Sequence, residues 1–556
     1  MTSLCHGQTK VGVWSDSVEK KWWQQFSTPA QWVVEEKVIH EQLLTIHERL
    51  GVAKVMKNPH FVGWLNHLKW LSLFPDQWEQ DPWWSQPEAR RTFQTIALQK
   101  ELRNAFLEAL SRYDNHSSAI EILSRIYQKY PKEAVAYPSL AVAFSIVFDQ
   151  PFPKGWPHHF VQERAVLNEP GPIEERFAFY VKSHQEKKLA YDLKRMSSDD
   201  LKFVVDTPVP LKELQHVQRV KLRNVKQLNL LFTMIRYDQV RLNQGGSLWP
   251  HGKYELFMIQ KNGGLCVDQA YYTAHTAKSK GIPTIFFLGQ GNSGEHAWLG
   301  FWERHGKWKF DLAKFQNEDY LVGQAFDPQS WHRLTDSECA FLDRQNSEDP
   351  GRVKAKACLR WAELNEGSPV YHATVREARL ASPGFIRAWE AEAGSLDRSE
   401  VGIEEQLRFW REWNQTFQKQ KDLLFRGQKR LLNLLEEAGR TNEYNTLLKK
   451  IIDGNKRERS DLVVSIAAER VFVLVEKKEW EKAHDTFRKT MSKLRTKAGG
   501  HLFYRLVQPY VNSCLEEGKM DHARDAIERA MRASNPQRGS LLEQDLKALE
   551  RLVKSR

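Results

Sequence analysis

Apolar residues recur at spacings of three and four over most of the chain, a pattern that predicts amphipathic helices. From Trp14 to about Tyr191 it is found in stretches such as FVGWLNHLKWLSLF and RTFQTIALQKELRNAFLEAL, with few strand-like alternations. It returns after about residue 346 and continues toward the C-terminus. Two mainly helical regions are therefore expected, one on each side of a shorter segment with a different pattern.

Three of the predicted helices resemble the second helix of a tetratricopeptide-type repeat, where small residues allow close helix packing. The first contains Ala119, Leu123 and Ile126 and is followed by Pro131. The other two lie in EWEKAHDTFRKTMSKL and EEGKMDHARDAIERAMRASNP, and they are farther apart than the standard period. We therefore expect a degenerate helical array, a surface of the kind that binds a protein partner.

The boundaries of the central segment are marked by changes in composition. SSDDLKFVVDTPVP, near Met196, combines a capping-type cluster, a β-branched run and two prolines, and NSEDPG (346–351) has the composition of a linker. These features predict a Trp-rich helical region over 1–195, a central domain over 196–345 and a helical region over 346–556. The part of the central domain between Asp311 and Gln345 shows no periodicity and is expected to be irregular.

A helix followed by an antiparallel meander is predicted inside the central domain. The helix begins after Gly263 and Gly264 and ends near Gly281 and Pro283. Its predicted apolar face is made by Val267, Ala270, Tyr271 and Ala274. The segments PTIFFLG, HAWLGFWE and KWKFDLA are predicted strands, the last two joined by a turn at His305-Gly306. Between 211 and 242, one or two further helices are expected, and YELFMIQ is a short element before the glycine pair.

Composition and charge narrow the class of protein. Nine of the 20 Trp lie before residue 90, which predicts a local core of large rings packed between helices. Lys and Arg outnumber Asp and Glu by 82 to 70, but they are interleaved with acids, so no nucleic-acid surface is predicted. The longest apolar run, around Tyr137 to Phe148, is too short to span a bilayer. No leader is visible, so we expect a cytoplasmic protein or an exported one whose leader is already removed.

The five cysteines are few and scattered, which favours reduced thiols over a disulfide framework. They are Cys5, Cys266, Cys339, Cys358 and Cys514. Cys266 stands out because it falls in the first turn of the predicted helix. The partial positive charge of a helix start favours a thiolate, so the pKa of Cys266 is expected below the ordinary value of about 8.5. The alternative is a small buried core residue.

A base and an orienting acid follow Cys266 in the order that nucleophilic catalysis requires. His296 begins the second predicted strand and Asp311 lies on the third. With a two-residue turn between these strands, the two residues share one face of the sheet. They are four residues out of register, so a bulge or a shifted turn is needed to bring them together. In this arrangement Cys266 attacks an acyl carbon, His296 transfers the proton and Asp311 orients the imidazole.

These residues resemble the core signature of the transglutaminase-like superfamily. The resemblance rests on Gly264-Leu-Cys266 with Ala270, Gly281-Ile-Pro283, His296-Ala-Trp298, Trp308 and Asp311, and it covers about fifty residues directly. It implies an α+β, papain-like fold with the Cys helix packed on a sheet that carries His and Asp. It also implies acyl transfer or amide hydrolysis without a metal or other cofactor. Asp311 follows Trp308 by one residue fewer than the family pattern.

Two weaker candidates accompany the triad. Gln260 precedes Cys266 by six residues, a position from which it could donate to an oxyanion, although it is equally an ordinary polar residue before a loop. Trp298 shares the strand face of His296 and is a candidate cleft wall, with core packing as the alternative.

Two other motifs are set aside. GQGNSG (289–294) matches GxGxxG, but a strand is predicted after it, so it lacks the helix start that binds a pyrophosphate, and a loop beside His296 is expected. His158, His159 and Glu163 lack further metal-ligand partners and are expected at the surface, at a helix start.

Two functions remain open. The first is cysteine-dependent acyl transfer at an amide bond of a protein or peptide, by a transglutaminase-like transferase or a peptidase-type hydrolase. The second is a non-catalytic interaction scaffold, in which the helical arrays bind a partner and the central domain is a relic. No membrane or nucleic-acid partner is expected for either.

Overall fold

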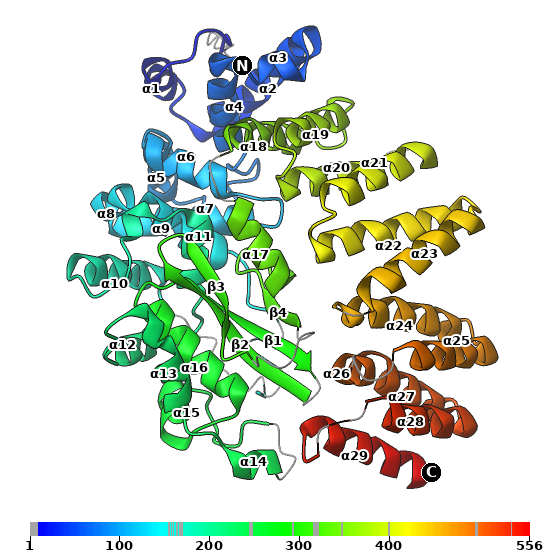
Figure 1. Ribbon diagram of the computed structural model, residues 1–556. Coiled ribbons are helices and arrows are strands. Elements are labelled where there is room, and N and C mark those ends of the chain that lie inside the picture. Colours follow the sequence, from blue (N-terminus) through cyan, green and yellow to red (C-terminus); the bar gives the residue numbers. More distant parts are fainter. Residues whose placement is uncertain are drawn as a thin grey trace.

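The fold is α+β, with helices surrounding one small antiparallel sheet (Figure 1). This computed structural model describes residues 9–555 except 154–155, 157, 159–160, 163–164, 166–170, 244–247, 292–293, 315–321, 346–348, 399–400, 457, 495–498, 535 and 537. Within the described residues, none of the helices combines the length and the apolar character needed to cross a bilayer.

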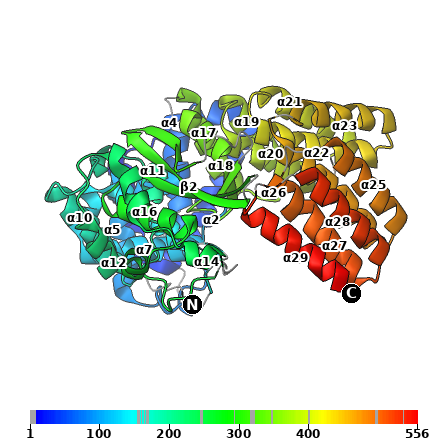
Figure 2. The same cartoon turned by 60° about the horizontal axis from the view of Figure 1, so that its bottom comes forward.

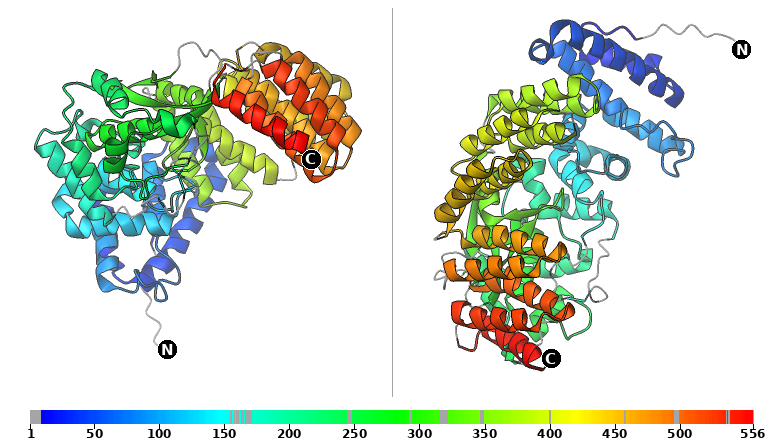
Figure 3. Two further views of the ribbon diagram at one scale, coloured as in Figure 1. Left: turned by 90° about the horizontal axis from the view of Figure 1, so that it is seen from below. Right: turned by 90° about the vertical axis from the view of Figure 1, so that its right-hand side faces the viewer.

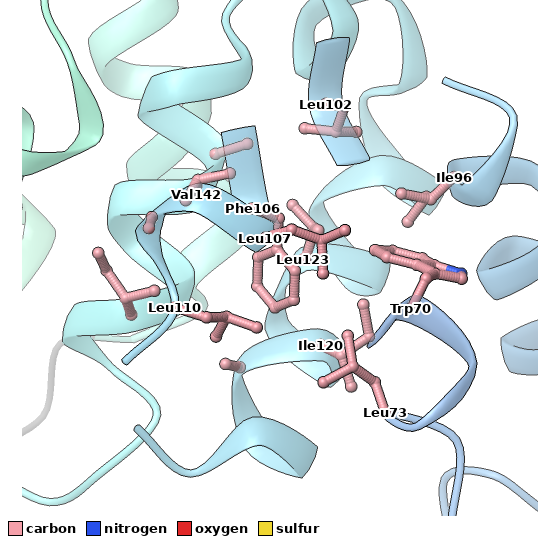
Figure 4. Close-up of a cluster of buried hydrophobic side chains, with 14 of the residues drawn as sticks. Trp70, Leu73, Ile96, Leu102, Phe106, Leu107, Leu110, Ile120, Leu123 and Val142 are labelled. Carbon is pink, nitrogen blue, oxygen red and sulfur yellow. The ribbon is translucent and has the colours of Figure 1, made fainter. Parts of the chain in front are cut away.

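The N-terminal region is helical, as predicted, and its core is rich in large rings. Four tryptophans surround Phe93: Trp70 stacks on it with ring centroids 4.9 Å apart, Trp84 and Trp23 meet it edge-on at 5.4 and 6.3 Å, and Trp32 lies tilted at 5.9 Å. Figure 4 shows the neighbouring aliphatic part of this core around Trp70. The helices are α1 (Asp16–Gln25), α2 (Pro29–Leu50), α3 (Val52–Val55), α4 (Pro59–Leu71), α5 (Pro87–Ala97), α6 (Lys100–Ala109), α7 (His116–Lys129), α8 (Pro131–Ala136), α9 (Pro138–Val147) and α10 (Ile173–Gln185).

Short helices lead from this region to the sheet. The capping-type cluster near Met196 begins a helix in which Ser197 is the N-cap. Three short helices stand where one or two were predicted, because an isolated bridge between Tyr237 and Gly264 separates the second from the third. The elements are η2 (Leu193–Arg195), α11 (Ser198–Val205), α12 (Leu211–Gln218), η3 (Val225–Gln227), α13 (Leu228–Met234), α14 (Gln239–Asn243) and α15 (Leu256–Asn262).

The sheet has five antiparallel strands in the order β3-β2-β1-β4-β5. The three predicted strands are confirmed as β1 (Thr284–Gly291), β2 (Gly294–Arg304) and β3 (Lys307–Leu312). The prediction of an irregular chain up to Gln345 was wrong. β4 (Val322–Phe326) pairs with β1, β5 (Arg333–Thr335) pairs with β4, and α17 (Asp336–Gln345) follows.

The predicted helix of the central domain is α16 (Cys266–Ser279), and it ends just before Gly281, whose φ of 70° favours glycine. One face packs on the sheet, where Ala297, Leu299 and Phe301 of β2 meet it. The other sides are covered by α12, α13 and α15, so every residue from 267 to 279 is buried. The helix is therefore the centre of this domain and holds Cys266 at one fixed end.

The chain after residue 349 is helical, as predicted, and most of it forms a column of paired helices beside the sheet (Figures 2 and 3). The column contacts the central domain through α22, which meets α17, and through α26 and α29, which meet β2. The helices are α18 (Pro350–Glu363), α19 (Val370–Ala381), α20 (Ile386–Arg398), α21 (Ile403–Thr416), α22 (Lys421–Glu437), α23 (Thr441–Asn455), α24 (Ser460–Glu476), α25 (Trp480–Lys493), α26 (Gly499–Leu502), the π-helical turn η4 (Phe503–Val507), α27 (Gln508–Glu516), α28 (Met520–Ser534) and α29 (Leu541–Ser555).

α18 is an exception, because it packs into the N-terminal core. Trp361 is fully buried, its ring lies 5.6 Å from Phe61, and its Nε1 donates to His47 Nδ1 at 2.7 Å. The ion pair between Lys69 and Glu363, at 3.0 Å, links the same two parts. The first helix after the sheet thus returns to the start of the chain.

Candidate functional site

The turn before Cys266 is built on two glycines that no other residue could replace without a shift. Gly263 has φ 83°, and a Cβ placed on it would lie 2.3 Å from the carbonyl oxygen of Arg236. A Cβ on Gly264 would lie 2.4 Å from the Cβ of Asp268. The Gly264 amide donates to the same Arg236 carbonyl at 2.9 Å. The glycine pair therefore sets where α16 begins, as the sequence predicted.

A buried carboxylate beneath this turn was not anticipated. Asp268 is fully buried and accepts three hydrogen bonds at 2.7 Å, from Arg241 Nη1, Tyr254 Oη and the Leu265 amide. Burial raises the pKa of Asp268, and the Arg241 guanidinium opposes that rise. The sequence places Asp268 in the first turn of the helix, which could have marked it as a capping residue. Its side-chain partners could not be predicted, because they come from distant segments. The group fixes the backbone immediately before Cys266.

His158 belongs to the same network, and the expectation that it lies at the surface was wrong. It is 2% exposed, and its Nε2 lies 2.9 Å from the hydroxyl of Tyr254. The same nitrogen is 4.0 Å from Asp268. The chain folds back onto the α16 start here, a long-range contact that local sequence does not encode. His159 and Glu163, named with His158 as possible ligands, lie outside the described residues.

Cys266 is the first residue of α16 and is half-buried. The nearby backbone amides of Ala297 and Val267 lower the pKa of its thiol. Burial nevertheless raises the pKa of the Cys266 thiol to about 11, and the Asp268 carboxylate adds to the rise. This direction is opposite to the expected one, because loss of solvation outweighs the two amides. The resting thiol is therefore protonated at neutral pH.

His296 lies on β2 directly before Ala297, the residue whose backbone amide acts on the Cys266 thiol. Its ring is buried and stacks near Trp298, with centroids 6.2 Å apart. Its Nε2 lies 2.6 Å from the carbonyl oxygen of Ala313, which can only accept, so Nε2 carries the proton. In the neutral ring, Nδ1 is then the basic nitrogen.

The register of the β2–β3 hairpin does not place Asp311 beside His296. The pairs Arg304–Lys307 and Leu299–Leu312 both agree with the predicted turn at His305-Gly306, and two register shifts between them cancel. The four-residue offset therefore persists at this end of the hairpin. Asp311 is exposed, and its carboxylate makes no hydrogen bond or ion pair within the described chain. The carbonyl of Ala313, two residues later, is the group that orients the imidazole.

The two weaker candidates also have defined positions. Gln260 is exposed on α15, and its Oε1 lies 3.3 Å from Nε2 of His216. Trp298 is fully buried between Gly289 and Gly323, where a Cβ on either glycine would lie 2.4 Å from the indole. Trp298 is therefore part of the core on the sheet face opposite α16.

The remaining motifs and the cysteines can be located in the part of the chain that is described. A strand, β2, begins at Gly294, as predicted, and residues 292–293 of the glycine-rich motif lie outside the described residues. No group of three His, Cys, Asp or Glu residues is arranged to hold a metal among the residues that could be searched. The four described cysteines are free thiols, and Cys5 lies outside the description.

Comparison of the chain with protein-family models, with curated proteins and with solved structures finds no match. The function is therefore inferred from the geometry around Cys266.

Proposed function

We propose that the protein catalyses cysteine-dependent acyl transfer at an amide bond, with Cys266 as the nucleophile. The observation that carries the proposal is the position of this sulfur: it lies at the start of a central helix, close to the amides of Val267 and Ala297. Such amides stabilise negative charge on sulfur and on an oxygen that develops beside it. A residue that served packing alone would not need this arrangement.

The proposed reaction begins with transfer of the thiol proton to Nδ1 of His296. The Cys266 sulfur then attacks the amide carbon, and a thioester forms as the amine leaves with the proton from His296. Water or a second amine attacks the thioester and regenerates the thiol. Water gives a hydrolase and an amine gives a transferase. Because the thiol pKa is about 11, deprotonation by a neighbouring base is required.

A specific observation favours a second candidate, the non-catalytic interaction scaffold. The predicted acid, Asp311, is exposed and remote in register from His296, and the resting thiol is held neutral. A relic site that lost its selective pressure has these properties. In this alternative the column of helices from α20 to α29 supplies the binding surface.

Thiol labelling and turnover distinguish the two. Iodoacetamide labelling of Cys266, measured by mass spectrometry across pH, is expected to be at least tenfold faster at pH 7 in the wild type than in His296→Ala. Incorporation of a fluorescent amine into casein, or release of casein fragments, should be lost in Cys266→Ala. Asp311→Asn should retain most of this activity, because Ala313 orients the imidazole. Labelling only near pH 11 in both proteins, with no turnover, would leave the scaffold as the function.

A further inference from the structure

A cavity of about 760 Å³ lies where the three parts of the chain meet, on the sheet face opposite α16. Its walls include Tyr113 from the turn before α7, Trp308 and Phe310 from β3, and Trp410 from α21. The volume is within the range of about 300–1,000 Å³ typical of small-molecule sites. None of the residues assigned to the acyl-transfer site lines it.

The charged residues of the wall do not balance. Eight cationic side chains and six carboxylates line the cavity. The cations are Arg112, Lys202, Arg333, Arg352, Lys356, Arg387, Arg426 and Arg430, and the carboxylates are Asp199, Asp200, Asp327, Glu338, Glu390 and Asp397. A cavity with surplus positive charge favours an anion.

Most of the carboxylates are already committed to particular cations. Arg426 binds both Glu338 and Glu390, at 2.9 and 2.6 Å. Lys202 pairs with Asp327 at 2.6 Å. These pairs account for half of the acidic groups and only two of the cations. Two further acids are used at other points of the wall: Asp397 pairs with Arg430, and Asp200 caps α11.

The cations with no carboxylate close by, or with only a distant one, are found at one corner of the cavity. Lys356 and Arg112 have no carboxylate within 4.0 Å among the described residues, and Arg387 has only Asp199, at 3.9 Å. Although burial opposes the change, the charges of Lys356, Arg387, Lys202 and Arg352 lower the pKa of Asp199 to about 2. Several cations therefore share one carboxylate.

A second, smaller cavity shares this corner. Arg112, Lys356 and Arg387 line both cavities, so these cations stand where the two hollows meet. The larger cavity continues past them to apolar surface: Trp410 and Trp413 on the helical side and Trp308 and Phe310 on the sheet side. A ligand with one anionic group and an apolar body would satisfy both surfaces.

We propose that this cavity binds a small organic anion, with its carboxylate, sulfonate or phosphate group held by Lys356 and Arg112 and its apolar body packed on the aromatic walls. These two cations stabilise such a group because, among the described residues, no carboxylate lies within 4.0 Å of either of them. The site is separate from Cys266, so it acts whether or not Cys266 is a nucleophile.

Two probes with the same aromatic skeleton test the proposal in the full-length protein. 8-Anilinonaphthalene-1-sulfonate carries the anion, and N-phenyl-1-naphthylamine lacks it. Fluorescence titration of the wild type should give saturable one-to-one binding of the sulfonate. Lys356→Glu should weaken sulfonate binding at least tenfold and change the affinity for the neutral probe less than twofold.

Lys54→Glu is the matched control, because Lys54 is exposed on α3, lies outside both cavities and makes the same change in net charge. It should leave both affinities within twofold of the wild type. Equal weakening of the sulfonate by both variants, or no saturable binding to the wild type, would overturn the proposal. If circular dichroism shows that Lys356→Glu is unfolded, Arg112→Glu decides by the same criteria, because Arg112 is exposed.

Discussion

Gly263 shows how a single backbone conformation positions the candidate nucleophile. Gly263→Ala should destabilise the protein by more than about 2 kcal/mol, since its φ of 83° and ψ of −170° cost an alanine about 1–3 kcal/mol and its Cβ would also meet the Arg236 carbonyl at 2.3 Å. Gly252→Ala is the matched control: φ is 74°, with no atom within 4 Å of the added Cβ. Urea unfolding should show a clearly smaller loss for the control. Equal losses would mean that the close approach to Arg236 is unimportant.

A pair of carboxyl groups makes stability depend on pH. Burial, and then the charge of Asp114, raise the pKa of Asp149 to about 7. The folded protein therefore holds a proton that the unfolded chain releases near pH 4, so stability from this group is full below pH 4 and is lost as pH rises to 7. The slope approaches about 1.4 kcal/mol per pH unit.

Asp149→Asn removes this proton uptake and should reduce the slope of unfolding free energy against pH between pH 4 and 7. Chemical denaturation at intervals of half a pH unit measures the slope. Asp521→Asn, at a fully solvated side chain, is the control and should leave the slope unchanged. An unchanged slope in Asp149→Asn would show that Asp149 is ionised throughout this range.

Single residues also show which properties of the site could be predicted from the sequence and which could not. The helix start at Cys266 followed from two glycines and a downstream Gly and Pro, all local signals. The pKa direction of the thiol did not, because burial is a sum over distant segments. The same holds for Ala313: a backbone carbonyl as the partner of His296 has no side-chain signature.

Secondary-structure elements with a strong hydrophobic periodicity were predicted from the sequence, and short elements without it were missed. β1, β2 and β3 have long apolar or alternating runs bounded by Gly and Pro, and all three were predicted. β4 has the sequence VGQAF, in which small residues hide the strand pattern. Its Gly323 is needed because the Trp298 indole occupies the place of a side chain. The reason for this residue lies in a different strand.

α16 illustrates why an amphipathic pattern gave only part of the answer. One apolar face was predicted, yet the helix is buried on every side. Its hydroxyl groups tolerate this because they bond to its own backbone: Thr273 donates to Gln269 O at 2.7 Å and Thr276 to Tyr272 O at 2.8 Å. Side chains satisfied within their own helix can be buried without a partner elsewhere.

At the scale of the whole molecule, sequence order and spatial order differ. α18 follows the sheet in the chain but packs with α2 and α4 near the N-terminus, through Trp361. The same packing of α18 against the N-terminal helices helps to form the positively charged cavity, because α18 supplies Lys356 to its wall. No local pattern predicts such a contact across roughly three hundred residues.

This packing makes α18 part of the N-terminal cooperative unit. Trp361→Ala removes a fully buried ring and leaves His47 without its donor, so a loss of about 3–5 kcal/mol is expected. Hydrogen exchange measured by mass spectrometry should accelerate in α2 and α4 as well as in α18. Trp480→Ala, in the separate core of the C-terminal helices, is the control and should accelerate exchange in those helices while leaving α2 and α4 unchanged. Unchanged protection of α2 in Trp361→Ala would show that the N-terminal helices fold independently of the returning chain.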